Sequence, residues 1–387
     1  MKHAFCWLVL ALAILSLSCS CRKEQEKGLL YYVTPNPYDI VSVQMPPASN
    51  EVRNVIFLIG DGMGLEQVSC GWVLNHGKLN LDNMPVVGLS RTYSASDLIT
   101  DSAAGGTALA IGQKTANHHV GTDPEGNPVP SMLVKAQECG KKTGVVVTCH
   151  LADATPADFC CHSDERYKYD EIIAGYADSG VDYIAGGVDY IAGGGRDYFG
   201  KNRKDARNID DEMGAKGYAL AYNEVELMEA HLPILALLAD DNMPEALERG
   251  DLFRHMVAKG LDELSSQCGD KGFVMMIEGS SIDDWEHENR IDMAMEELLD
   301  FDRTLGDVLQ WAAADGHTLV VVTADHATGA LTLQDGDLAE GRIGVAFGND
   351  SHNGIAVPFY AWGPGSDQFG GIMENAELGA LITSMIK

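Results

Sequence analysis

Three short runs of apolar residues, each followed at once by acidic or histidine side chains, constrain most strongly how this chain can fold. The runs cover residues 54–59, 272–277 and 318–322, and each has the length of a strand that is buried on both faces. Helical patterns separate the strands along the chain, which is typical of a parallel sheet covered on both sides. The sequence therefore predicts an α/β fold with a central, mostly parallel sheet and helices on both faces.

The residues that follow these strands have the side chains of metal ligands. Asp61 stands just after the first run, Glu278 follows the second, and Asp325 and His326 follow the third. Ligands in open α/β sheets bind at the carboxyl ends of the strands. We therefore expect these four side chains at one edge of the sheet.

Two further segments add candidate ligands. Asp283 and His287 are four residues apart, on one face of a helix turn, and His352 precedes an apolar strand at 355–362. A single strand-terminal aspartate or a single histidine is usually a cap, a turn residue or a surface side chain. The occurrence of aspartate, glutamate and histidine at several strand ends of one chain favours a metal centre. Oxygen and nitrogen donors without thiolates suit Zn²⁺, together with Mg²⁺ in an all-oxygen position.

A serine among small residues is a candidate nucleophile. Ser102 lies in the segment 100–107, Thr-Asp-Ser-Ala-Ala-Gly-Gly-Thr, at the expected start of a helix. Small neighbours leave room for a bulky anion at the hydroxyl, and N–H groups at a helix start attract negative charge. The alternative for this segment is an ordinary helix N-cap.

Taken together, these segments resemble the alkaline phosphatase family over about residues 54–364. The motifs stand in the family's order: Gly-Asp-Gly-Met-Gly at 60–64, Asp-Ser-Ala-Ala at 101–104, Asp-Ala-Thr-Pro-Ala at 153–157, Glu-Gly-Ser-Ser-Ile-Asp at 278–283, Thr-Ala-Asp-His at 323–326, and His352. The resemblance implies an alkaline-phosphatase-like fold and a phosphate monoesterase that forms a phosphoserine intermediate on Ser102.

The resemblance also implies two zinc ions and a third ion, normally magnesium. One zinc would be held by Asp283, His287 and His352. The other, beside Ser102, would be held by Asp61, Asp325 and His326. The third ion would be held by Asp61, Asp153, Thr155 and Glu278.

Arg166 stands where the family has its phosphate-binding arginine; the alternative is a solvated arginine at a helix end. A bidentate clamp on two non-bridging oxygens favours a monoester over a diester, in which one such oxygen is esterified. Two other functions stay open: a phosphodiesterase of the same superfamily, and a non-catalytic metal- or phosphate-binding lipoprotein. A sulfatase is not favoured, because the segment around Ser102 lacks the motif that is converted to formylglycine.

The net charge of −30 argues against nucleic acid as a partner. It does not exclude small phosphate monoesters, because metal ions and Arg166 would make the site itself positive. We therefore expect small phosphate monoesters as the substrates.

The amino terminus predicts export. Residues 1–21 combine a charged start with a short apolar core and read as a signal peptide, of the lipoprotein type if cleavage precedes Cys19 or Cys21. Ordinary cleavage with a soluble product is the alternative. We expect the protein in the periplasm or cell envelope, in contact with a membrane only through a lipid anchor. Residues 22–50 are predicted as a tether that leads into one catalytic domain at 51–387, because the ligands span this whole region.

Four features depart from a simple pattern. Residues 181–187 are repeated at 188–194, and the sequence leaves open which copy pairs in the sheet. Asp284 would add a carboxylate near the third ion or face solvent. The stretch 327–351 is short, whereas larger relatives have a crown domain here that is used in dimer contacts. We therefore expect a reduced crown, and the sequence leaves open whether the protein forms a homodimer. Six cysteines lie beyond the leader, and their spacing reveals no disulfide pairing: Cys70, Cys139, Cys149, Cys160, Cys161 and Cys268.

Overall fold

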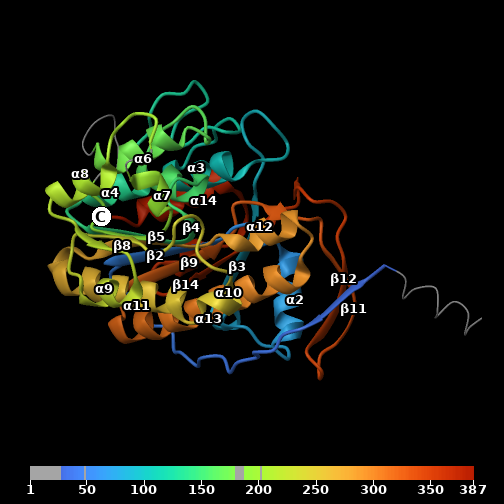
Figure 1. The fold of residues 1–387 in the computed structure, drawn as a ribbon. Helices are drawn as coiled ribbons and strands as arrows, with labels where there is room; N and C mark the ends of the chain where they lie inside the picture. The colour runs from blue at the N-terminus through green and yellow to red at the C-terminus, as the bar shows by residue number, and fades with distance from the viewer. Residues whose placement is uncertain (1–27, 48, 179–186, 201–202) are drawn as a thin grey trace, which may run out of the picture.

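The computed structural model describes residues 28–47, 49–178, 187–200 and 203–387, and a ten-stranded sheet lies at its centre (Figure 1). In spatial order the strands are β15 (Gly371–Glu374), β3 (Val86–Arg91), β14 (Val357–Trp362), β9 (Thr318–Thr323), β2 (Asn54–Gly60), β8 (Phe273–Gly279), β4 (Lys142–His150), β5 (Tyr190–Gly194), β7 (Ile234–Leu237) and β6 (Ala219–Ala221). Only β14 runs antiparallel to its neighbours, β3 and β9. The predicted mostly parallel sheet is confirmed.

The three predicted strands are neighbours at the centre of the sheet. Phe57 of β2 pairs with Met276 of β8 on one side and with Val321 of β9 on the other. All three strands are parallel and fully buried, so their carboxyl ends meet at one edge. Strand boundaries differ from the prediction by one or two residues, and one difference moves a candidate ligand. Because β8 continues to Gly279, Glu278 lies inside the strand, opposite Ile59, and not beyond its end.

Helices cover both faces, and two hydrophobic clusters fill the layers between helices and sheet. On one face lie α3 (Ser102–Ile111), α4 (Met132–Glu138), α5 (Ala154–Cys160), α6 (Tyr169–Ala177), α8 (Ile209–Ala215) and α14 (Asn375–Ser384). On the other lie α2 (Leu65–Leu74), α9 (Glu224–Glu229), α10 (Ala246–Arg249), α11 (Leu252–Gln267) and α13 (Ile291–Asp315). Side chains of β2 alternate between the clusters: Ile56 and Leu58 enter one, while Val55, Phe57 and Ile59 enter the other. The short helices α7 (Arg196–Phe199) and α12 (Ser281–His287) and the 3₁₀ turns Asn80–Asn83, Gly269–Lys271 and Ser366–Gln368 complete the helical elements described.

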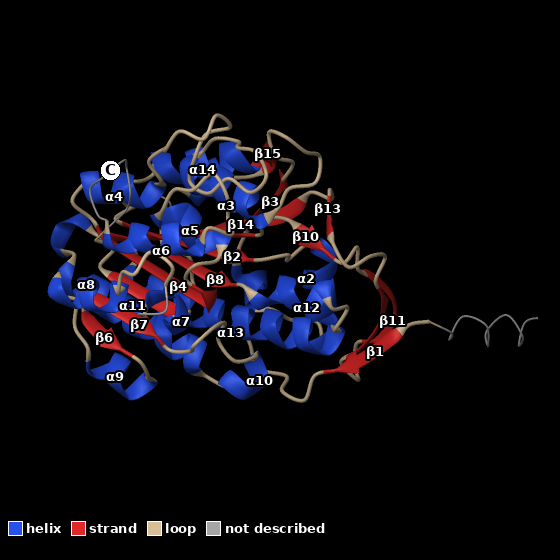
Figure 2. Ribbon diagram, turned by 45° about the horizontal axis from the view of Figure 1, so that its top comes forward, coloured by secondary structure: helices blue, strands red, loops and turns tan. Residues whose placement is uncertain are grey.

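A small three-stranded sheet lies at one side of the molecule, apart from the large sheet (Figure 2). It consists of β1 (Leu30–Val33), β12 (Arg342–Ala346) and β11 (Thr332–Asp337). Beyond β1 the chain is fastened to α13, because Thr34 Oγ1 donates to Glu296 at 2.6 Å and the Tyr38 hydroxyl donates to Asp302 at 2.6 Å. The described part of the predicted tether, 28–47 and 49–50, thus packs on the body of the protein.

The structure answers some questions that the sequence left open. The second copy of the tandem duplication forms β5, between β4 and β7, while residues 181–186 of the first copy lie outside the described ranges. All six cysteines of the described ranges are free. Among the described residues, no helix combines the length and the apolar character needed to cross a membrane.

Candidate active site and metal centre

A histidine and two aspartates meet at the carboxyl edge of the sheet. His326 Nε2 lies 3.4 Å from Asp61 Oδ1 and 3.1 Å from Asp325 Oδ2. Asp61 follows β2, the other two residues follow β9, and all three are buried. Gly62 turns the chain here with a φ of 72°, and a Cβ at this position would come within 3.1 Å of the Asp283 side chain. Glycine therefore permits the close approach of the two segments.

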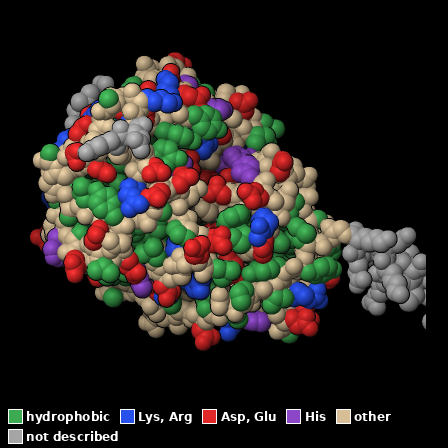
Figure 3. Space-filling view, in the orientation of Figure 1, with side chains coloured by type: hydrophobic (Ala, Val, Ile, Leu, Met, Phe, Trp, Pro, Cys, Tyr) green, Lys and Arg blue, Asp and Glu red, His purple; other side chains and the backbone are tan. Residues whose placement is uncertain are grey.

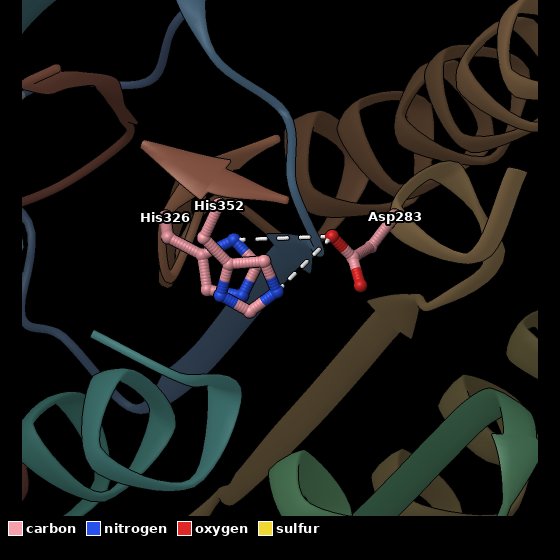
Figure 4. Close-up of side chains that lie close together, drawn as sticks. All are labelled: Asp283, His326 and His352. Carbon is pink, nitrogen blue, oxygen red and sulfur yellow. Dashed lines mark ion pairs between the residues drawn. The ribbon is translucent and has the colours of Figure 1, made fainter. Parts of the chain in front are cut away.

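A second cluster adjoins the first. His287 Nε2 lies 3.1 Å from Asp283 Oδ2 and 3.1 Å from His352 Nε2. The His326 and His352 rings stack with their centres 3.5 Å apart, and both rings turn nitrogen atoms toward Asp283 (Figure 4). Three donors around one zinc ion at about 2 Å would lie roughly 3.3 Å apart, close to the separations seen here. The structure thus brings together both predicted sets of zinc ligands.

Contacts behind the clusters orient the ring nitrogens. His287 Nδ1 lies 2.7 Å from the carbonyl oxygen of Asp350, and His352 Nδ1 lies 2.9 Å from that of Thr100. A carbonyl oxygen only accepts, so each Nδ1 carries a proton, and Nε2 is the nitrogen that each ring turns toward the cluster. Loss of the proton on Nε2 would leave a neutral imidazole that can bind a metal ion through that nitrogen.

Thr328 is a residue of the site that sequence reasoning missed. Its Oγ1 donates to Asp283 Oδ1 and lies 3.2 Å from His326 Nδ1. The residue belongs to β10 (Ala327–Thr328), where it pairs with His352 of β13 (His352–Asn353). Its place two residues after His326 is the one sequence feature that could have marked it as part of the site. Only the pairing of β10 with β13 shows which ligands it contacts.

The carboxylates are crowded in a way that calls for cations. Burial and the charges of Asp325 and Asp283 raise the pKa of Asp61 well above its usual range. Burial and Asp283 raise the pKa of Asp325 to about 7, and burial and Asp153 raise that of Glu278 to about 8. Asp283 differs, because hydrogen bonds from His287 and His352 outweigh the effect of burial and lower its pKa.

Unsatisfied buried oxygens support the same conclusion. Asp61 Oδ1, Asp325 Oδ2 and Thr155 Oγ1 are buried, and none makes a hydrogen bond with the described residues. Buried polar atoms without a partner are rare in folded proteins, and a bound ion is one of the few ways to satisfy them. The donor atoms at this edge therefore fit divalent metal ions.

The third predicted set comes from the loop after β2, from β8 and from the start of α5. Thr155 and Glu278 are buried, and Glu278 Oε2 lies 3.6 Å from Cys149 Sγ. Asp153 caps α5 by accepting the Ala154 N–H at 2.7 Å. Asp284 accepts a 3.4 Å hydrogen bond from the Asn242 amide, and although it reaches the surface, desolvation by the surrounding protein and the charge of Asp153 raise its pKa to about 7.

Ser102 begins α3 as predicted, and only 4% of it is exposed. Its Oγ lies 3.2 Å from Nε2 of His326. In Figure 3, histidine and acidic side chains gather around a hollow of this face. A Cβ on Gly105 would lie 3.0 Å from the carbonyl oxygen of Asp325, so a glycine in the first helical turn lets α3 approach the loop after β9.

Asp101 connects the serine to the arginine. Its Oδ1 caps α3 by accepting the Ala104 N–H at 3.0 Å, and its Oδ2 accepts from Arg166 at 3.3 Å. Arg166 also donates to Asp153 at 3.1 Å. Together these two carboxylates raise the pKa of the guanidinium despite its burial. Sequence reasoning gave Asp101 no role of its own, although its place before Ser102 marks a helix cap.

Comparison with known proteins decides the family. The family model for alkaline phosphatase matches residues 52–341, and alkaline phosphatase 4 of Bacillus subtilis (strain 168) is 31% identical over an alignment that covers 87% of this chain and 89% of that protein. This chain belongs to the alkaline phosphatase family.

Two solved structures extend the match to the fold. Alkaline phosphatase from the Antarctic bacterium TAB5 is 33% identical, with a TM-score of 0.79 over 89% of this chain and 99% of that one. A variant of the TAB5 enzyme with magnesium bound in its M3 site matches with the same values. The alkaline-phosphatase-like fold is thereby confirmed, and the family and the magnesium-bound structure support metal cofactors.

Proposed function

We propose that this alkaline phosphatase family member hydrolyses phosphate monoesters through a phosphoserine formed on Ser102. The observation that carries the proposal is the position of the Ser102 hydroxyl, 3.2 Å from Nε2 of His326, a residue that belongs to both groups of side chains that could hold a metal ion. Arg166 pairs with Asp153 and with Asp101, the residue before Ser102, and so supplies a positive charge near the start of α3.

The reaction consists of two displacements at phosphorus. Ser102 gives up its hydroxyl proton to water, its Oγ attacks the phosphorus atom, the bond to the ester oxygen breaks, and the leaving alkoxide takes up a proton from water. A water molecule then attacks the phosphoserine, the bond between Ser102 Oγ and phosphorus breaks, a proton returns to Ser102 Oγ, and inorganic phosphate leaves. Arg166 binds two non-bridging oxygens throughout, which favours a dianionic monoester. Bound divalent ions supply Lewis acidity, which favours the ionised serine and negative charge on the leaving oxygen.

The donor sets support two zinc ions and one magnesium ion. Each zinc set combines carboxylates with imidazole, which suits Zn²⁺: Asp283, His287 and His352 for one, and Asp61, Asp325 and His326 for the other. The third set offers oxygen donors only, which suits Mg²⁺: Asp61, Asp153, Thr155 and Glu278.

Export to the periplasm or cell envelope is part of the proposal. Its support is the sequence of residues 1–21, with Cys19 or Cys21 as the lipid attachment site. The test labels cells with a radioactive lipid precursor and compares the wild-type protein with variants that lack Cys19, Cys21 or both. If the variant without both cysteines still carried the label, neither cysteine would be the lipid attachment site.

The first test compares a nitrophenyl phosphate monoester with the corresponding diester. The purified enzyme is assayed with zinc and magnesium, after chelation, and after zinc is restored. We expect fast monoester hydrolysis that chelation abolishes and zinc restores. A preference for the diester would assign a phosphodiesterase and remove Arg166 from its role, while no metal-dependent hydrolysis of either ester would favour a binding protein.

A further inference from the structure

A pocket lined by three tyrosines adjoins Arg166. Tyr167 precedes α6, Tyr169 begins it, Tyr198 lies on α7, and the cavity between them has a volume of about 520 Å³. Cavities of a few hundred Å³ are typical of small-molecule sites. The centre of the Tyr167 ring lies 5.7 Å from Arg166 Cζ, and 60% of this residue is exposed. One ring of the pocket's lining therefore lies next to Arg166, the proposed phosphate-binding residue.

The rings are held in fixed positions by one another. The centres of Tyr167 and Tyr169 are 6.4 Å apart and those of Tyr169 and Tyr198 are 5.3 Å apart, both with nearly perpendicular planes. The buried His150 ring packs against the last two, with its centre 4.6 Å from that of Tyr198. The Tyr198 hydroxyl also donates to Asp241 at 3.0 Å. A ligand ring would meet an aromatic surface that is already assembled, which limits the affinity lost to the ordering of side chains.

Two of the cations at the pocket, Arg203 and Lys168, are engaged by the protein itself. The Arg203 guanidinium is buried, pairs with Asp205 and donates to the carbonyl oxygen of Tyr198 at 3.0 Å. Lys168 pairs with Asp164 and lies 3.7 Å from Glu171. Lys204, Asp170, Glu171 and Asp197 also line the pocket, so its charged groups are of both signs, and the aromatic faces are the feature that favours a ring.

We propose that this tyrosine pocket binds the aromatic ring of the leaving group, as in an aryl or nucleoside monophosphate, while Arg166 holds the phosphate. The inference rests on the proposed function and adds a substrate class to it. Offset or edge-to-face contact with one ring changes affinity by roughly 3- to 10-fold. The pocket thus gives aromatic monoesters an advantage over aliphatic ones.

The test measures kcat/KM for phenyl phosphate, adenosine 5′-monophosphate and glycerol 3-phosphate. We expect Tyr167→Ala and Tyr169→Ala to lower the ratio of aromatic to glycerol ester by roughly 3- to 10-fold, mainly through KM. Tyr167→Phe should keep the ratio, because it keeps the ring. The control is Tyr31→Ala, which removes a similarly exposed ring from β1, on the other side of the molecule from α6 (Figure 2), and should not change the ratio.

Binding without turnover separates the two proposals. Benzylphosphonate and cyclohexylmethylphosphonate carry a carbon–phosphorus bond that the enzyme does not hydrolyse, and calorimetry gives their affinities for the metal-loaded enzyme. We expect the benzyl compound to bind more tightly to the wild type and the preference to disappear in Tyr167→Ala. Unchanged ratios and preferences in the tyrosine variants of an active enzyme would overturn the pocket assignment. If the protein preferred the benzyl compound but hydrolysed no phosphate monoester, the proposed function would be refuted and the pocket assignment would stand.

Discussion

Replacement of Thr328 by valine should weaken metal binding without disturbing the fold. Thr328 is fully buried, and its hydroxyl donates to Asp283, a proposed zinc ligand, beside His326. Valine has nearly the same shape but no donor, so Asp283 would lose a contact that fixes its orientation. The ligands themselves would all remain.

The magnitude follows from the type of hydrogen bond. A hydrogen bond to a charged group contributes about 1.5–3 kcal/mol, which corresponds to a roughly 10- to 150-fold change in a binding constant. Loss of contacts behind metal ligands typically lowers metal affinity by about 10- to 100-fold. We therefore expect zinc affinity to fall within this range, measured by competition with a coloured chelator. Activity at low zinc should fall in parallel and should recover when zinc is in excess.

Thr318 offers a matched control. It is also fully buried, and its hydroxyl donates to Asp315 at 2.6 Å, but it lies at the start of β9, at the opposite edge of the sheet from the site. Thr318→Val should reduce stability without changing zinc affinity. Wild-type zinc affinity in Thr328→Val, or a loss of activity that excess zinc does not restore, would refute the orienting role of Thr328.

Three other outcomes are expected. Ser102→Ala should retain its metal ions but form no phosphoenzyme from a radiolabelled ester, and normal turnover by this variant would rule out Ser102 as the nucleophile. Arg166→Ala should raise the inhibition constant for inorganic phosphate by roughly 10- to 100-fold, and unchanged inhibition would remove Arg166 from the site. Burial raises the pKa of Asp302 to about 6, above about 3.9 in an unfolded chain, so the folded state binds this proton more tightly. The free energy of unfolding should therefore fall more steeply in the wild type than in Asp302→Asn as the pH rises from about 4 to about 6, measured by urea unfolding; equal slopes would contradict the assignment.

Much of the site was predictable because its residues stand at strand ends. Asp61 and Asp325 follow apolar runs that form adjacent parallel strands, and adjacent parallel strands bring their carboxyl ends together. Asp283 and His287 share a helix face by their spacing alone. Glu278 was predicted to follow its strand, because an acidic residue after an apolar run usually marks the end of a buried strand. In the structure, pairing with β2 extends β8 past Glu278.

The sequence by itself determined the strands, the start of the Ser102 helix and the types of donor atoms, because these depend on local periodicity and side-chain chemistry. Tertiary structure alone decided that Thr328 contacts Asp283, that Asp101 joins Ser102 to Arg166, and that the second copy of the duplication enters the sheet. It also assembled the tyrosine pocket from α7 and the start of α6. Contacts of this kind join segments far apart in the chain. Their geometry follows from how the helices pack on the sheet, which no local pattern specifies.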